Sequence, residues 1–268
     1  MNNNIKTNNI KTNNIKIMFE NIPIFWINLN DSLDRCNKIK TQLNNYNNNY
    51  RIEAIDGRNK INFFNNYNIK YTDEYNYTAS VLAVSCSHIK AIKQGYDCGY
   101  EMICVFEDDV DFELIPHYPH TLKEIISIAP NDWEIIQLYH NDKLINDLNF
   151  YKNNGLMVFK PAKYYSGTCY LINKKGMAKI LKEVVEVINI NTYNFLINGI
   201  EPEKVLFSIL NYYVLNFPFL HFGSSVPTFD KYFNNDNNCK KECQKLHCEI
   251  KNNLKDFILN LTKENKSK

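Results

Sequence analysis

Glycine is scarce in this sequence, with 8 residues in 268, and no glycine-rich phosphate loop of the dinucleotide-binding or P-loop type occurs. The sequence therefore does not favour a dinucleotide or a P-loop nucleotide as the ligand. The sequence also lacks a run of about 18 apolar residues and has no apolar signal-peptide core at its N-terminus. We therefore expect a cytoplasmic protein with no signal peptide and no transmembrane segment.

Neither sign of charge predominates. The 31 basic residues nearly balance the 29 acidic ones and leave a formal net charge of +2, which favours neither nucleic acid nor a membrane surface as a partner. The 8 cysteines include no Cys-x-x-Cys pair, and Cys86, Cys104 and Cys169 fall within apolar segments. Such a distribution is typical of free thiols in a reducing compartment.

Acidic residues gather at one point of the chain, directly after an apolar segment. Residues 102–106 form an apolar run of strand length, which predicts a strand buried on both faces. Five acids follow within seven positions: Glu107, Asp108, Asp109, Asp111 and Glu113. Each close pair of like charges costs on the order of 1 kcal/mol in water and more in a partly dry cleft. The first three acids therefore favour a bound divalent cation or substrate over a helix cap, whereas the last two fit the solvated side of a turn.

The apolar pattern predicts that the chain opens with a β-α-β unit. Residues 22–29 read as a strand, and residues 51–55 read as a second strand that ends in the turn sequence Asp56-Gly57. The helix between them has its apolar residues at helical spacing: Leu33, Cys36, Ile39, Leu43 and Tyr46. This arrangement brings strand ends and helix N-termini together, as binding of a phosphate-bearing ligand requires.

The remaining pattern predicts an α/β fold with a mostly parallel central sheet flanked by helices. Further strands are expected at 102–106, 133–138 and 164–172, and helices at 78–96, 116–129, 174–188 and from residue 201. Residues 59–77 show no clean period and read as a loop. The helix at 78–96 is expected to have one apolar face, formed by Leu82, Ser85, Ile89, Ile92 and Tyr96.

The chain is expected to have three parts. An asparagine-rich repeat makes residues 1–18 a disordered low-complexity tail, residues 19–232 form the domain, and residues 233–268 form a C-terminal helical tail. The apolar residues of the last part could pack on the domain or form a homo-oligomer with a second copy. A zinc site is the weaker alternative for the four potential ligands there, Cys239, Cys243, His247 and Cys248.

Several further polar residues could serve a site or only the fold. Ser87 and His88 lie inside a predicted helix, where a lone histidine is more often a packed core residue than a catalyst. Asp142 follows a predicted strand, in a loop that is expected to line the same cleft as the acidic stretch. Glu201 and Glu203 flank a proline and suit the N-terminus of a helix almost as well as they suit catalysis.

Six short segments occur in one order between residue 22 and the region of residue 225. They are residues 25–29 with Asp34-Arg35, residues 54–57, Ser87-His88, and residues 105–110, 133–138 and 170–176. In this combination they resemble glycosyltransferase family 25, the family of lipooligosaccharide and procollagen sugar transferases. Two positions depart from the family pattern: Ala83-Val84 stands where Gly-Cys is usual, and Glu203 stands where an aspartate is usual.

The resemblance implies a single GT-A type, Rossmann-like nucleotide-binding domain. Such an enzyme transfers a hexose, often galactose or glucose, from a UDP-sugar to an acceptor hydroxyl on a glycan or glycoprotein, with inversion. The resemblance also implies that Mn²⁺ or Mg²⁺ binds the acidic stretch, with Asp109 as the first choice of ligand and Glu107 and His221 as further candidates. The residues expected to bind the nucleotide sugar are Asn28, Leu29, Arg35, Asp56, Gly57, His88, Glu107 and Asp108.

The chemistry of the residues agrees with that function. A divalent cation would offset the charge that develops on the departing diphosphate, and a carboxylate or a histidine would take the acceptor proton. Glu203, Glu201, His221 and Asp142 are the catalytic candidates. A non-catalytic nucleotide- or glycan-binding module on the same scaffold is the alternative. A phosphotransferase or nuclease would also use clustered carboxylates, but the near-neutral charge and the missing phosphate loop disfavour it.

Overall fold

A seven-stranded sheet forms the centre of the molecule. The computed structural model describes residues 17–66, 68–71, 79–139, 151–161, 166–189, 192–197, 201–217, 221–222 and 252–260. The strand order is β2-β1-β4-β8-β6-β11-β7. In chain order these strands are β1 (Ile24–Asn28), β2 (Asn49–Glu53), β4 (Met102–Glu107), β6 (Ile135–Gln137), β7 (Val158–Phe159), β8 (Cys169–Asn173) and β11 (Tyr212–Leu215).

Five of the seven strands run in the same direction. Strand β1 pairs in parallel with β2 and β4, and β6 pairs in parallel with β11. Strand β8 is antiparallel to both β4 and β6, which makes β4 and β6 parallel to each other, and β7 is antiparallel to β11 at the sheet edge. The carboxyl ends of β1, β2 and β4 therefore meet along one edge, where ligands of α/β sheets bind.

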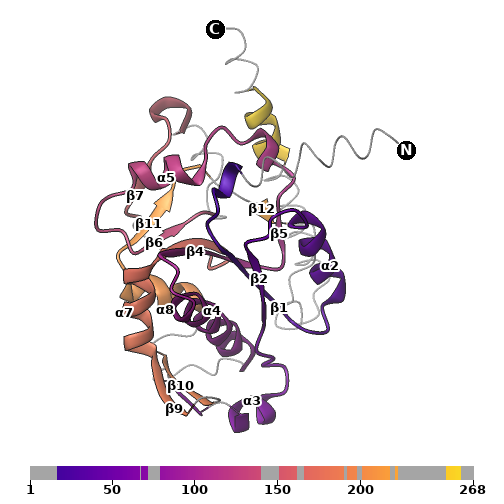
Figure 1. The fold of residues 1–268 in the computed structure, drawn as a ribbon, viewed down its shortest axis with the longest axis vertical. Helices are drawn as coiled ribbons and strands as arrows, with labels where there is room; N and C mark the ends of the chain where they lie inside the picture. The colour runs from indigo at the N-terminus through magenta and orange to yellow at the C-terminus, as the bar shows by residue number, and fades with distance from the viewer. Residues whose placement is uncertain are drawn as a thin grey trace.

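Helices cover both faces of the sheet (Figure 1). On one face, α2 (Leu33–Gln42) and α5 (Leu122–Ile128) pack on side chains such as Trp26 and Cys104. On the other face, α4 (Ala79–Asp97), α7 (Lys174–Val184) and α8 (Pro202–Ile209) pack on Phe25 and Ile103. Neighbouring residues of a strand thus enter opposite hydrophobic clusters, as strand geometry requires. The predicted α/β, Rossmann-like fold class with a mostly parallel sheet is confirmed.

The strand that precedes the acidic stretch has the burial expected of a central strand. The side chains of residues 103–106 in β4 are all 0 % exposed. Because β4 lies between β1 and β8, both of its edges are hydrogen-bonded and both of its faces are covered. The predicted strand buried on both faces is confirmed, and it ends at Glu107.

Two small sheets lie outside the main one. Strand β10 (Thr192–Ile197) pairs with β3 (Asn68–Tyr71) in parallel and with β9 (Val185–Asn189) in an antiparallel arrangement. Strand β5 (Val110–Asp111) pairs with β12 (His221–Phe222), so that the C-terminal half of the chain returns to the acidic stretch.

Two sequence predictions are wrong in this region. The predicted loop over residues 59–77 contains α3 (Lys60–Asn66) and β3, and residues 72–78 lie outside the described residues. The helix predicted over 174–188 ends at Val184, where β9 begins. Residues 184, 185, 187 and 188 are all β-branched, and such residues favour a strand once β10 is available as a partner.

Other elements differ from the prediction at their boundaries. Strand β2 covers 49–53 rather than 51–55, and β8 covers 169–173 rather than 164–172, of which residues 162–165 lie outside the described residues. Helix α5 begins only after Thr121, because Thr121 and Glu124 form a reciprocal capping box, and Pro116 lies in the separate 3₁₀ turn η1 (Ile115–His117). Leu33 and Tyr96 were expected on apolar helix faces but are 64 % and 38 % exposed, because each lies at a helix end.

A helix over residues 252–260 belongs to the same core as the sheet. Its residues Leu254 and Ile258 are each 1 % exposed and join the cluster that contains Trp26. The four candidate zinc ligands of the C-terminal part and residues 1–16 lie outside the described residues. Within the described ranges, every helix is too short or too polar to cross a bilayer.

Candidate functional site

A cavity of about 330 Å³ opens at the carboxyl ends of β1, β2 and β4. All eight residues expected to bind the nucleotide lie on its wall, namely Asn28, Leu29, Arg35, Asp56, Gly57, His88, Glu107 and Asp108. They come from four separate parts of the chain, and the parallel strands bring them together. The remaining wall includes Arg58 and the α4 residues Ser80, Val84 and Ser87, which the sequence analysis did not place among the ligand-binding residues.

Asp108 is held on both of its carboxylate oxygens. Arg35 Nη1 lies 2.8 Å from Oδ1, and Asn28 Nδ2 donates to Oδ2 at 2.6 Å. Arg51 Nε in turn donates to Asn28 Oδ1 at 3.0 Å, which fixes the amide orientation of Asn28. Burial raises the pKa of Asp108, and the charge of Arg35 and the hydrogen bond from Asn28 offset only part of that rise. Asp108 is thus oriented by the protein itself and is a wall group of the cavity.

Asp109 is in the opposite situation. Its side chain is buried, the residue being 6 % exposed, and Oδ1 has no hydrogen-bond partner among the described residues. Burial is the main reason why the pKa of Asp109 lies well above its usual value, and the negative charges of Glu107 and Asp108 raise it further. Asp109 does not line the cavity itself. A buried carboxylate oxygen without a partner is a group for which a cation would be a favourable neighbour.

The residues fit a divalent cation that takes some of its ligands from the protein and the others from the substrate. Among the described residues, no three acidic, histidine or cysteine side chains converge as a complete metal cage. Hard cations such as Mg²⁺ are often bound by only one or two carboxylates, with substrate phosphates and water completing the shell. Asp109 and Glu107 are the residues of the acidic stretch that could serve in this way, since both oxygens of Asp108 already have partners.

His88 connects the acidic stretch to the opposite wall. The residue is 0 % exposed, its Nδ1 lies 3.1 Å from the hydroxyl of Tyr170, and its Nε2 lies 3.4 Å from Glu107 Oε1. His88 is therefore a packed, hydrogen-bonded residue and at the same time part of the cavity wall.

The turn after β2 closes another side of the cavity. Arg58 forms ion pairs with Asp56 and, at 2.6 Å, with Asp31, so it links the turn after β2 to the turn after β1. The hydrogen bonds from Arg58 lower the pKa of Asp56. A Cβ on Gly57 would lie 2.3 Å from the carbonyl oxygen of Ala79, so only glycine allows the turn to pack this closely on the start of α4.

Residues 21–197 match the protein family described as glycosyltransferase family 25 (LPS biosynthesis protein). The match covers well over half of the chain. The chain belongs to glycosyltransferase family 25. The resemblance inferred from the six segments is thereby confirmed, and this protein is a glycosyltransferase, with a sugar donor and an acceptor as its partners. No curated protein matches the chain significantly.

The catalytic candidates of this family 25 glycosyltransferase lie beyond the matched range or outside the described residues. Glu203 lies in the first turn of α8, and its Oε2 is 3.6 Å from where a Cβ on Gly167 would stand. Burial raises the pKa of Glu203, with smaller contributions from Glu107 and Glu201, so the three carboxylates influence one another. Asp142 lies outside the described residues.

The backbone of His221 lies beside the acidic stretch. In the β5–β12 pair it stands opposite Asp111, two residues after Asp109, and its side chain lies outside the described part. The expectation that Asp111 faces solvent is wrong: the residue is 8 % exposed and its carboxylate lies 3.1 Å from Lys38 Nζ, because the pairing of β5 covers it. Glu113 is exposed, as expected.

Besides Ser80, Val84 and Ser87, three residues at the site of this glycosyltransferase were not predicted from the sequence. Arg58 directly follows Asp56-Gly57, two residues that were expected to bind the nucleotide sugar. Its position in the sequence could therefore have indicated its place at the cavity. Arg51 and Tyr170 gave no such signal, because each acts on a residue far away in the sequence, Asn28 and His88 respectively.

Proposed function

We propose that this glycosyltransferase transfers a hexose from a UDP-sugar to a hydroxyl group of a glycan or glycoprotein acceptor, with Mn²⁺ or Mg²⁺ at the acidic stretch. The observation that carries the proposal is the carboxylate of Asp109, which is buried without a partner on Oδ1 beside two further acids. Such an arrangement is unfavourable for the protein alone and becomes favourable when a cation binds.

The volume of the cavity and the charges on its wall favour a nucleoside-diphosphate sugar, bound together with a cation, as the donor. Its volume of about 330 Å³ lies within the range of small-molecule sites. Its wall carries Asp56, Glu107 and Asp108 against only two guanidinium groups, and both of those are already paired with carboxylates. An anionic diphosphate would meet net repulsion on such a wall, so a cation that accompanies it is the simplest source of attraction.

The wall also offers unpaired polar groups to a ligand. Ser80 Oγ is buried and has no hydrogen-bond partner among the described residues, and Ser80 lines the cavity. A ribose or phosphate oxygen could satisfy this hydroxyl, as buried polar groups require.

The residues of the site would divide the reaction between leaving group and acceptor. When bound by Glu107 and Asp109, the cation would neutralise the charge that develops on the departing diphosphate. Glu203 is the carboxylate we assign as the base: it takes the proton of the acceptor hydroxyl while that oxygen bonds to the anomeric carbon. The bond from this carbon to the diphosphate breaks, so a single displacement inverts the configuration. The raised pKa of Glu203 makes it a better proton acceptor near neutral pH.

Substitution of Asp109 tests the proposal. Asp109→Asn removes the charge but keeps the shape, and we expect it to abolish hexose transfer and donor hydrolysis, both measured as UDP release. Asp97→Asn is the matched control, because Asp97 is exposed and pairs with Lys93 on α4. An unimpaired rate in Asp109→Asn would refute the proposal. A thermal-shift screen of nucleotide sugars with and without Mn²⁺ then identifies the donor, since a ligand of the native state raises its Tm.

A further inference from the structure

Tyr170 is a buried residue of β8 that contacts His88 and is not among the residues that line the cavity. It is 0 % exposed and stands opposite Val105 in the β4–β8 pair. Its ring is stacked on that of His88, with centroids 5.7 Å apart and an interplanar angle of 29°. The Tyr170 hydroxyl lies 3.1 Å from Nδ1 of His88, which is hydrogen-bonding distance.

The second ring nitrogen of His88 faces a carboxylate. Nε2 lies 3.4 Å from Glu107 Oε1 and makes no hydrogen bond, to this carboxylate or to any other group, among the described residues. A distance of this length is common in a ligand-free site, where catalytic hydrogen bonds tighten only when substrate binds. The Glu107 side chain itself is 26 % exposed and lines the cavity.

These contacts distinguish the two tautomers of the His88 ring. If Tyr170 donates to Nδ1, the proton of the imidazole is on Nε2 and points at the Glu107 carboxylate, which can only accept. In the other tautomer, Nδ1 would donate to the phenol oxygen and the lone pair of Nε2 would face the carboxylate. Two acceptors would then oppose each other in a buried place, which is unfavourable.

We propose that Tyr170 is a positioning residue of the glycosyltransferase, which fixes the Nε2–H tautomer of His88 and thereby holds Oε1 of Glu107. The other oxygen, Oε2, stays available to the donor or its cation. This inference rests on the proposed function for its catalytic consequence, but the tautomer itself can be observed without any substrate.

The first test is spectroscopic. In protein labelled with ¹⁵N-histidine, long-range ¹H–¹⁵N correlation spectra distinguish a protonated from an unprotonated ring nitrogen. The chain has 6 histidines, and the signals of His88 are those that disappear in His88→Gln. We expect a protonated Nε2 and an unprotonated Nδ1 in the wild type. A proton on Nδ1, alone or on both nitrogens, overturns the proposal.

The second test is kinetic. Tyr170→Phe removes only the hydroxyl, and we expect kcat for sugar transfer to fall roughly 10- to 100-fold, as for other groups that orient a ligand carboxylate or histidine. Tyr46→Phe is the matched control, because it also removes a buried phenol that donates a hydrogen bond, here to the carbonyl oxygen of Ile22 at 2.6 Å, away from the cavity. We expect the control to lower Tm by a similar amount and to leave kcat unchanged. Equal kcat values for Tyr170→Phe and the wild type overturn the proposal.

A double-mutant cycle separates positioning from a general packing defect. In His88→Gln the amide Nε2 can donate to Glu107 and has no tautomer for Tyr170 to fix. We therefore expect Tyr170→Phe to cause no further loss of kcat in this background. An unchanged loss would show that Tyr170 acts through packing and would overturn the proposal. The proposed Nε2–H signature in a protein that turns over no UDP-sugar, with Mn²⁺ or without it, would overturn the proposed function and leave the tautomer assignment standing.

Discussion

At the scale of one residue, Asp109 illustrates how a buried carboxylate oxygen without a hydrogen-bond partner lowers the stability of the protein. Its carboxylate is buried beside Glu107 and Asp108, and Oδ1 has no partner among the described residues. The folded-state pKa is raised well above the usual 3.8 of an aspartate, first by burial and then by the two neighbouring charges. The folded protein therefore binds this proton more tightly than the unfolded chain does, and stability is lost as pH rises from about the usual value through the folded pKa.

We predict that Asp109→Asn raises the Tm at neutral pH, because the amide carries no charge to be desolvated. For a chain of this size each kcal/mol gained corresponds to roughly 2–4 °C. The difference between variant and wild type should grow as pH increases from acid to neutral. Asp111→Asn is the matched control: Asp111 is also buried but pairs with Lys38, so its replacement should lower the Tm. Differential scanning calorimetry across pH measures both, and a lower Tm for Asp109→Asn at neutral pH would contradict the prediction.

Gly57 is the residue at which the smallest possible change should remove donor binding. The Cβ of Gly57→Ala would lie 2.3 Å from the Ala79 carbonyl oxygen and 2.5 Å from Ser80 Cα, both in the backbone of α4. The turn must move, at a cost of about 1–3 kcal/mol, and it carries Asp56 and Arg58 away from the cavity wall. If UDP-sugar and Mn²⁺ bind as proposed and raise the Tm of the wild type, we expect that increase to disappear in Gly57→Ala.

Gly99→Ala is the control for this prediction. Gly99 has a φ of +78°, so alanine is strained there by about 1–2 kcal/mol, but nothing lies within 4 Å of the added Cβ. We expect this variant to lose stability and to keep its full ligand-induced shift. A shift of normal size in Gly57→Ala would show that the turn tolerates the methyl group.

At the residue scale, the sequence predicts a site residue when the residue lies next to an element end. Asn28 ends β1, Glu107 ends β4, and Asp56-Gly57 follows β2. The apolar run before Glu107 predicted its place, and the resemblance to family 25 implied the places of Asn28 and Asp56-Gly57. Tyr170 could not be placed in either way, because its partner His88 is 82 positions away and the contact depends on the register of β8 against β4. Residues that act through another residue leave no local pattern.

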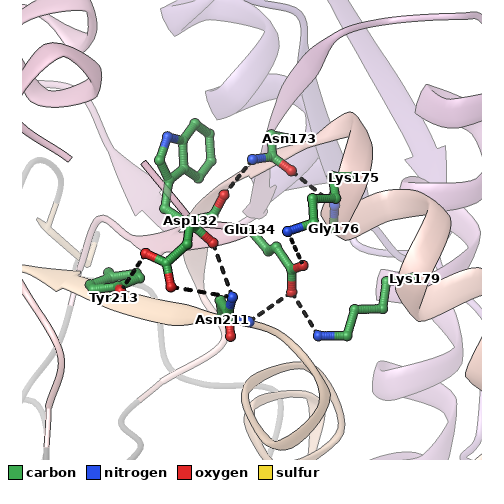
Figure 2. A network of polar contacts seen from close by, with 9 residues as sticks. Asp132, Glu134, Asn173, Lys175, Gly176, Lys179, Asn211 and Tyr213 are labelled. Atoms are coloured by element: carbon green, nitrogen blue, oxygen red, sulfur yellow. Dashed lines mark hydrogen bonds and ion pairs between the residues drawn. The ribbon is translucent and has the colours of Figure 1, made fainter. Parts of the chain in front are cut away.

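At the scale of elements, the buried carboxylate of Glu134 lies at the amino end of β6, away from the carboxyl ends of the strands that line the cavity. Figure 2 shows Glu134, directly before β6, with its side chain directed at Lys175 and Lys179 of α7 and at the backbone of Asn211 before β11. The distances are 3.2 Å to Lys175 Nζ, 2.9 Å to Lys179 Nζ and 2.8 Å to Asn211 N. The Glu134 carboxylate thus links the start of β6 to α7 and to the residue directly before β11.

Glu134 should make the stability of these elements depend on pH. Burial alone would raise its pKa, but the Asn211 N–H and the two lysines outweigh burial, and the pKa lies below the usual 4.5. Its contribution is therefore present above that usual value and is lost as pH falls through the folded pKa.

We predict that Glu134→Gln lowers the free energy of unfolding at neutral pH by about 1–3 kcal/mol, because it weakens three contacts of a buried acceptor. The loss should shrink at acidic pH, where the wild-type carboxylate is protonated as well. Glu101→Gln is the control, since Glu101 also pairs with a lysine of α7, Lys174, but both side chains are largely exposed. Urea unfolding at several pH values tests this, and equal losses in the two variants would contradict it.

Elements could be predicted where their own residues decide the structure. Strand β4 is an uninterrupted apolar run, and α8 starts at Pro202 in a favourable first turn, so both are evident locally. Strands β3, β9 and β10 are different, because Asn68 pairs with Asn194 across more than a hundred residues and the polar segment around it has no period of its own. Val185 and its β-branched neighbours become a strand only because β10 lies beside them.

At the scale of the whole molecule, the two ends of the described chain meet in one hydrophobic cluster. Met18 and Phe19, which precede β1 in the sequence, are buried. Leu254 and Ile258, near the other end of the described chain, are buried in the same cluster. Tyr151 and Phe217 connect them, with ring centroids 4.5 Å apart and both within 6 Å of Phe257. The helix over 252–260, yellow in Figure 1, thus packs on the face of the sheet that α2 and α5 also cover.

This placement leads to a prediction about the C-terminal helix, which the sequence suggested could join two copies of the chain. Because Leu254 is 1 % exposed within one chain, Leu254→Ala should cost about 2–5 kcal/mol by leaving a cavity in the shared cluster, and the molecular mass in solution should not change. Leu33→Ala is the control: Leu33 is 64 % exposed, so the same truncation there should leave the Tm nearly unchanged. Thermal unfolding gives the stability and light scattering gives the mass. A wild-type dimer that Leu254→Ala converts to a stable monomer, with little loss of Tm, would show that this helix packs between copies and not on its own domain.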